Sequence, residues 1–184
     1  MPIDTELITK LNALEDTIRA DTKTKTLRTE LWRSLDFNGN GIVSLAEIDK
    51  WVVERYPLLN SKPALMRAYK KTTLKDGNGD DWVQRNEFIK LLRNIFYFNR
   101  VYMVFDDIDT DDDRRIDLGE FSAGFDVLRL GEEHTAENVF KAIDRNGGGF
   151  ILFNEFCSWF AKNMNVEDLL ADELEDMEVV GKEN

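Results

Sequence analysis

The stretch that decides the fold is DFNGNGIVSLAE, which runs from Asp36 to Glu47. Oxygen-bearing side chains stand at positions 1, 3, 5, 9 and 12 of these twelve residues, and glycine stands at position 6. A helix-loop-helix calcium loop has this layout, with a backbone carbonyl added at position 7 and a bidentate glutamate at position 12. The predicted ligands of this first loop are Asp36, Asn38, Asn40, Ile42 (through its carbonyl), Ser44 and Glu47.

Three further stretches repeat this layout, and the four loops begin at Asp36, Asp76, Asp109 and Asp144. Each has Asp first, Glu twelfth and a β-branched residue eighth, and apolar residues recur at helical spacing on both sides. The loops start 40, 33 and 35 residues apart, and a recurrence at this spacing indicates repeated supersecondary units. The sequence therefore predicts an all-α fold of four helix-loop-helix units. The eighth residues should pair across two short sheets, Val43 with Val83 and Ile116 with Ile151.

The second loop keeps most of the ligand pattern, and its candidate ligands are Asp76, Asn78, Asp80, Trp82 (through its carbonyl) and Glu87. Its sixth residue is Asp81, where the tight turn normally requires glycine. Aspartate tolerates a left-handed conformation better than most residues. The pattern leaves calcium binding at this loop open.

The third loop is the most acidic, and its candidate ligands are Asp109, Asp111, Asp113, Arg115 (through its carbonyl), Asp117 and Glu120. Its sixth residue is Arg114, and a left-handed conformation there costs roughly 1–2 kcal/mol. Bound metal could offset this cost, because clustered carboxylates repel one another without a cation. Apolar residues continue after this loop at helical spacing, and Gly131 is the expected end of that helix.

The fourth loop has Gly149 at the turn, but Gly148 at position 5 supplies no side chain and Leu152 stands at position 9. One ligand is therefore missing. We expect this loop to keep the fold and to bind calcium weakly or not at all. A single partial match is more often a solvated turn, but four matches in register favour the metal-loop fold.

Composition excludes several classes of function. The chain has 184 residues and a net charge of -12, which argues against a nucleic-acid binder and favours basic partners or cations. Its one cysteine excludes an internal disulfide. No apolar run predicts a transmembrane helix, and no phosphate-cradling motif or nucleophile–base pair indicates an enzyme.

The pattern predicts four segments: an amphipathic helix over 1–22, lobes over 23–98 and 99–165, and an acidic tail over 166–184. The tail carries eight acidic residues against Lys182, with Leu170, Leu174 and Met177 at helical spacing. Docking of the tail into an apolar groove and a solvated tail without structure are equally compatible with this composition.

The four loops identify the chain as a member of the EF-hand superfamily. Three stretches resemble the calflagins, the flagellar calcium-binding proteins of trypanosome-type protists: Glu30-Leu-Trp32, the aromatic run from Phe96 to Asp106, and Asn154-Glu-Phe-Cys-Ser-Trp159. The resemblance implies a calcium-responsive protein of the flagellum, held at the membrane by N-terminal acyl chains. Here Pro2 follows Met1 and no cysteine lies nearby, so the acylation motif is absent from this sequence.

These features favour a calcium sensor of the cytoplasm and, by resemblance, of the flagellum or cilium. Ca²⁺ would rearrange helices and expose an apolar groove for a protein target, for example a flagellar or axonemal protein. The first alternative is a structural, microtubule-associated axonemal protein whose EF-hands are largely independent of calcium. The second alternative is a cytosolic calcium buffer that opens little.

Overall fold

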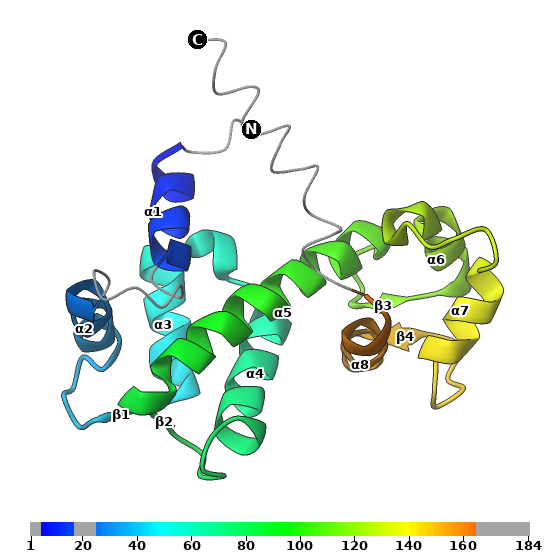
Figure 1. Ribbon diagram of the computed structural model, residues 1–184. Coiled ribbons are helices and arrows are strands. Elements are labelled where there is room, and N and C mark those ends of the chain that lie inside the picture. Colours follow the sequence, from blue (N-terminus) through cyan, green and yellow to red (C-terminus); the bar gives the residue numbers. More distant parts are fainter. Residues whose placement is uncertain (1–4, 17–24, 165–184) are drawn as a thin grey trace. The chain divides into compact units, whose positions relative to one another are not determined.

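The computed structural model describes residues 5–16 and 25–164 (Figure 1). The predicted acidic tail, and residues 1–4 and 17–22 of the predicted N-terminal helix, lie outside these ranges. The chain divides into two compact units, 1–99 and 100–184. Both are built mainly of helices with two-residue strands, as the repeat pattern predicts.

The first unit contains two helix-loop-helix hands preceded by a separate helix. Its elements are α1 (Thr5–Asp16), α2 (Lys25–Leu35), β1 (Ile42–Val43), α3 (Leu45–Arg55), η2 (Pro57–Leu59), α4 (Lys62–Lys70), η3 (Lys71–Lys75), β2 (Val83–Gln84), η4 (Arg85–Glu87) and α5 (Phe88–Ile108), which begins in this unit and ends in the second. Strands β1 and β2 are antiparallel, and Val43 lies opposite Val83. Both valines are fully buried, so the predicted pairing of the first two loops is confirmed.

The second unit repeats this arrangement after α5. Its further elements are β3 (Arg115–Ile116), α6 (Leu118–Ala123), η5 (Phe125–Leu128), α7 (Ala136–Ile143), β4 (Ile151–Leu152) and α8 (Phe153–Asn163). Ile116 lies opposite Ile151 in the antiparallel pair of β3 and β4, which confirms the second predicted pairing. Each β-branched side chain at the eighth position is thus buried against the one from the neighbouring loop.

Pairs of aromatic side chains lie in the core of each unit. In the first unit the ring of Trp32 meets Phe88 edge to face, with centroids 5.6 Å apart, and α1 contributes the buried Leu14. In the second unit Phe105 contacts Phe156 edge to face at 5.5 Å. Such pairs contribute beyond the area they bury, and they fix the helices that carry the loops.

The helix after the third loop ends earlier than predicted. Helix α6 stops at Ala123, the 3₁₀ turn η5 follows, and Gly131 lies beyond both elements. The break falls at Gly124, where a Cβ atom would come within 3.1 Å of the side chain of Ile108. Glycine is a weak helix former, and this close packing against α5 favours a turn there over a continued helix.

Candidate metal centres

Three of the four loops make the same turn. In the first, third and fourth loops, the backbone N–H of position 6 donates to Oδ2 of the aspartate at position 1. The bonds are Gly41 to Asp36 at 3.0 Å, Arg114 to Asp109 at 2.9 Å and Gly149 to Asp144 at 2.9 Å. Positions 4 and 6 of these loops have positive φ, including 59° at Asp112 and 68° at Arg114. The third loop therefore adopts the glycine geometry without glycine.

The glutamate at position 12 is drawn into its loop. Glu47 accepts the backbone N–H of Ser44 at 2.9 Å and the side-chain amide of Asn38 at 2.7 Å. Glu120 accepts the N–H groups of Thr110 at 2.9 Å and Asp117 at 3.0 Å. Each carboxylate thus links both ends of its loop, where a bidentate calcium ligand must lie.

The first loop places its predicted ligands around a short turn. The side-chain oxygens of Asn38 and Asn40 accept the N–H groups of the residues two positions ahead, at 2.9 and 3.1 Å. Ser44 caps α3 and donates its hydroxyl to Glu47 at 2.9 Å. Asp36 is 8% exposed, and its Oδ1 is buried without a hydrogen-bond partner. A bound cation would satisfy this buried carboxylate oxygen.

The third loop gathers carboxylates. Ligand oxygens of Asp109, Asp111 and Glu120 lie within 4.8 Å of one another, the one such acidic cluster among the described residues. Oδ1 of Asp109 is buried without a hydrogen-bond partner, as at Asp36. Burial raises the pKa of Asp109, and the negative charge of Glu120 adds to the rise. A divalent cation here would relieve both effects.

The other two acidic candidate ligands of the third loop have other partners. Asp113 pairs with the guanidinium of Arg115, with Oδ2 to Nη2 at 2.7 Å, and this side-chain hydrogen bond lowers the pKa of Asp113. Asp117 caps α6 by accepting the N–H of Glu120 at 2.8 Å. Arg115, whose backbone carbonyl is a predicted ligand, lies on β3.

The second loop does not make the shared turn. Asp81 at position 6 has no positive φ, so the left-handed conformation that the calcium loop normally has there is not adopted. Oδ2 of Asp76 accepts the Lys71 ammonium at 2.9 Å and the Asn94 amide at 3.0 Å. Asp80 binds Asn78 and Gln84 instead. Trp82 projects a half-exposed side chain.

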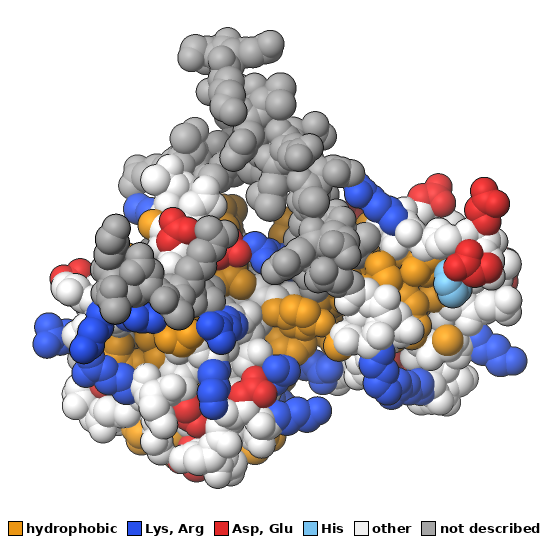
Figure 2. All heavy atoms as spheres, in the orientation of Figure 1, with side chains coloured by type: hydrophobic (Ala, Val, Ile, Leu, Met, Phe, Trp, Pro, Cys, Tyr) orange, Lys and Arg blue, Asp and Glu red, His pale blue; other side chains and the backbone are white. Residues whose placement is uncertain are grey.

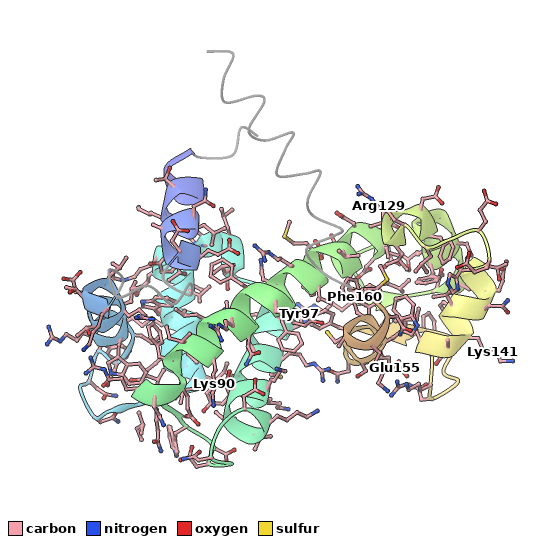
Figure 3. All side chains as sticks on the ribbon, in the orientation of Figure 1. Lys90, Tyr97, Arg129, Lys141, Glu155 and Phe160 are labelled. Atoms are coloured by element: carbon pink, nitrogen blue, oxygen red, sulfur yellow. The ribbon has the colours of Figure 1, made fainter. Side chains whose placement is uncertain are left out.

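Lys71 and Asn94 were missed by reasoning from the sequence. Asn94 offered a signal, because it lies at helical spacing from Leu91 and Phe98, on the apolar face of the predicted helix, where polar residues are buried only with partners. In the fourth loop both Asp144 oxygens accept backbone N–H groups, from Gly148 and Gly149. The Glu155 side chain (Figure 3) accepts the amide of Asn146 at 3.0 Å.

Comparison with known proteins bears on this geometry. A family model described as an EF-hand domain pair matches residues 98–161, which include the third and fourth loops. Residues 98–161 form an EF-hand pair. Calcium is the cation that EF-hand loops bind, and the acidic cluster of the third loop fits it.

The chain is similar to flagellar calcium-binding proteins of trypanosomes. It is 29% identical to flagellar calcium-binding protein TB-17 of Trypanosoma brucei brucei over 150 residues, which cover 76% of this chain and 64% of that protein. It is 27% identical to the flagellar calcium-binding protein of Trypanosoma cruzi over 146 residues, which cover 73% and 69%. The chain thus spans about two thirds of the length of these relatives.

Among solved structures, the chain is similar to a homolog of programmed cell death 6 protein from Leishmania major Friedlin. It superposes with a TM-score of 0.38 and 21% identity, over 70% of this chain and 71% of that one. Among the helices within 5–16 and 25–164, none has the length and apolar character needed to span a bilayer.

Proposed function

We propose that the protein binds two calcium ions, one in each unit, at the first and third loops. The observation that carries this proposal is the pair of buried oxygens without hydrogen-bond partners, Oδ1 of Asp36 and Oδ1 of Asp109. Leaving a buried acceptor unsatisfied costs about 1–3 kcal/mol, and more for a charged group. A cation at each loop offsets that cost, and the fourth-loop aspartate has no such oxygen.

The proposed ligands follow the twelve-residue layout. In the first loop they are Asp36, Asn38, Asn40, the carbonyl of Ile42, Ser44 and Glu47. In the third loop they are Asp109, Asp111, Asp113, the carbonyl of Arg115, Asp117 and Glu120. Ligand charge tunes calcium affinity, so the acid-rich third loop should bind more tightly unless the Arg114 backbone offsets that advantage.

Counting bound ions by native mass spectrometry tests these assignments. The wild-type protein should carry two calcium ions, and Glu47→Gln and Glu120→Gln should each carry one. Glu155→Gln changes the same position of the fourth loop and should leave the count at two. If Glu47→Gln still carries two ions, the first loop is not a calcium site.

The finer proposal is that the protein is a flagellar calcium sensor that acts on a protein target. Two observations support it: the flagellar calcium-binding relatives, and apolar side chains exposed in both units, such as Phe37 and Met103.

The two units also differ in charge. Residues 25–99 hold thirteen Lys and Arg against nine Asp and Glu, whereas residues 100–164 hold seven against fourteen. Figure 2 shows many basic side chains over the first unit.

A calcium buffer or a structural axonemal protein is the second candidate. The glutamates at position 12 favour the buffer, because they already lie inside their loops and so need little movement on binding. Hands of buffer proteins barely open when calcium binds. A dye that fluoresces on apolar surface separates the sensor from the buffer: a sensor gains dye fluorescence as calcium binds, whereas a buffer binds calcium without that gain. Extraction with detergent tests the structural candidate, which should stay with the axonemes whether or not calcium is present.

A further inference from the structure

We infer that the second hand holds no calcium, because the ammonium group of Lys71 takes the place of the ion as the resident positive charge beside Asp76. The inference rests on contacts of the second loop alone. It does not depend on whether the first and third loops bind calcium.

The helix that enters the second loop has a different winding. In the other loops the N–H of the first aspartate bonds to the carbonyl four residues back, as from Asp109 to Phe105 at 2.9 Å. The N–H of Asp76 bonds instead to the carbonyl of Lys71, five residues back, at the end of the π-helical turn η3. One extra residue in a turn rotates the following side chain by roughly 100°. Asp76 therefore faces Lys71 and not the N–H of position 6.

Buried side chains hold this wide turn in place. Thr72 is fully buried, and its hydroxyl donates to the carbonyl of Ala68 at 2.8 Å and accepts the Asn94 amide at 2.9 Å. Asn94 is 6% exposed and lies on α5, in the helix that leaves the loop. The same amide nitrogen donates to Asp76, so the entering and leaving helices are joined through Asn94. A buried polar network that is satisfied in this way specifies one arrangement.

Two ammonium groups supply the positive charge. Nζ of Lys71 lies 2.9 Å from Oδ2 of Asp76 and also donates to Oδ1 of Asn94 at 3.3 Å. Nζ of Lys90 (Figure 3) donates to the backbone carbonyl of Asp76. Burial opposes ionisation of Asp76, but the hydrogen bonds from Lys71 and Asn94 outweigh it and lower its pKa. The carboxylate of Asp76, at position 1 of the second loop, is thus compensated without an ion.

The rest of the second loop is held by contacts between Glu87 and the loop backbone. Oε1 of Glu87 accepts the N–H of Asn78, and a Cβ at Gly77 would clash with that oxygen and with the carbonyl of Thr72. Strand β2 nevertheless pairs with β1 and buries Val83 against Val43. The second hand therefore supports the first loop in a form that needs no calcium.

Whether neutralising Asp76 stabilises or destabilises the protein in chelator tests the inference. In an ordinary calcium loop, neutralising an acid relieves repulsion and stabilises the protein in chelator. Here Asp76→Asn removes the partner of Lys71, so it should lower the folding equilibrium constant in chelator about fivefold. Lys71→Met should do the same, and the double variant should lose less than the two changes combined. Asp111→Asn in the third loop is the matched control and should be neutral or stabilising.

Ion counting supplies an independent readout. Asp80→Asn and Glu87→Gln should leave the number of bound calcium ions equal to that of the wild type. The calcium-induced change in tryptophan emission should also persist in Trp82→Phe, because Trp82 lies in a loop that does not respond. Loss of one ion in Asp80→Asn or Glu87→Gln, or a more stable Asp76→Asn protein in chelator, overturns the inference. If the wild type binds no calcium at all, the sign of the Asp76→Asn change still decides it.

Discussion

The backbone N–H of Arg114 donates a 2.9 Å hydrogen bond to Oδ2 of Asp109 while Arg114 holds a φ of 68°. Gly41 makes the equivalent bond to Asp36 in the first loop, at a φ of 82°. The bond that closes the turn is thus the same in both loops, but an arginine must adopt a glycine conformation to make it in the third. That strain is local, so removing it should be measurable.

Replacing Arg114 by glycine should stabilise the protein and strengthen calcium binding at the third loop. Release of the left-handed strain is worth roughly 1–2 kcal/mol, of which the greater chain entropy of glycine takes back about 0.5–1. Thermal melts in chelator and calcium titrations measure the two effects. Arg129→Gly is the control, because Arg129 also has positive φ but lies after η5 and outside the loop. Unchanged calcium affinity in Arg114→Gly would contradict the prediction.

The stability due to Asp76 should depend on pH with a definite sign. Its pKa in the folded protein is lowered from 3.8. The ionised form is therefore favoured by folding, and the stabilisation is present above the ordinary pKa and lost as pH falls through the lowered one. In chelator, the difference in unfolding free energy between wild type and Asp76→Asn should shrink as the pH falls below about 4. A difference that stays constant there would be inconsistent with an ionised Asp76.

The hydroxyl of Ser34 accepts a hydrogen bond from the buried indole of Trp51. Its Nε1 donates to Oγ of Ser34 at 2.8 Å, and Trp51 is 3% exposed. Ser34→Ala leaves that N–H without its acceptor and should destabilise the protein by about 1–3 kcal/mol, measured by denaturant unfolding. Ser158→Ala is matched to it, because both hydroxyls donate to a carbonyl in the preceding turn of their own helix. That control should change stability by less than about 0.5 kcal/mol.

The Ile116–Ile151 pair should couple the third and fourth loops. Both side chains are fully buried, so Ile116→Ala and Ile151→Ala should each cost about 2–5 kcal/mol. The double variant should lose less than the sum, because the two side chains share one packing site. Calcium affinity at the third loop should fall even in Ile151→Ala, which changes no ligand. Leu152→Ala, one residue along β4 and 40% exposed, should leave both quantities nearly unchanged.

The repeat itself predicted much of the architecture. An aspartate, a β-branched residue and a glutamate at fixed positions predicted where Val43 meets Val83 and Ile116 meets Ile151, because the register of such a short sheet follows from loop length. The same reasoning identified the acids of the third loop that gather at Asp109. These features depend on residues close together in the sequence.

The exceptions depend on partners that are distant in the sequence. The wide turn at Lys71–Lys75 depends on Asn94, which lies on the next long helix, and no local propensity indicates it. The early end of α6 at Gly124 depends on packing against Ile108. The composition of the second loop left calcium binding open, because the Lys71–Asp76 pair appears only once the entering helix is wound with five residues in its last turn.

The placement of the glutamates at position 12 sets the timescale of any response. Glu47 and Glu120 already reach across their loops, so these carboxylates need only exchange their N–H donors for an arriving ion. Association is then paced by the shedding of water from the ion, and dissociation alone separates a tight loop from a loose one. Rapid mixing with chelator should resolve two release phases of different speed, one from each unit.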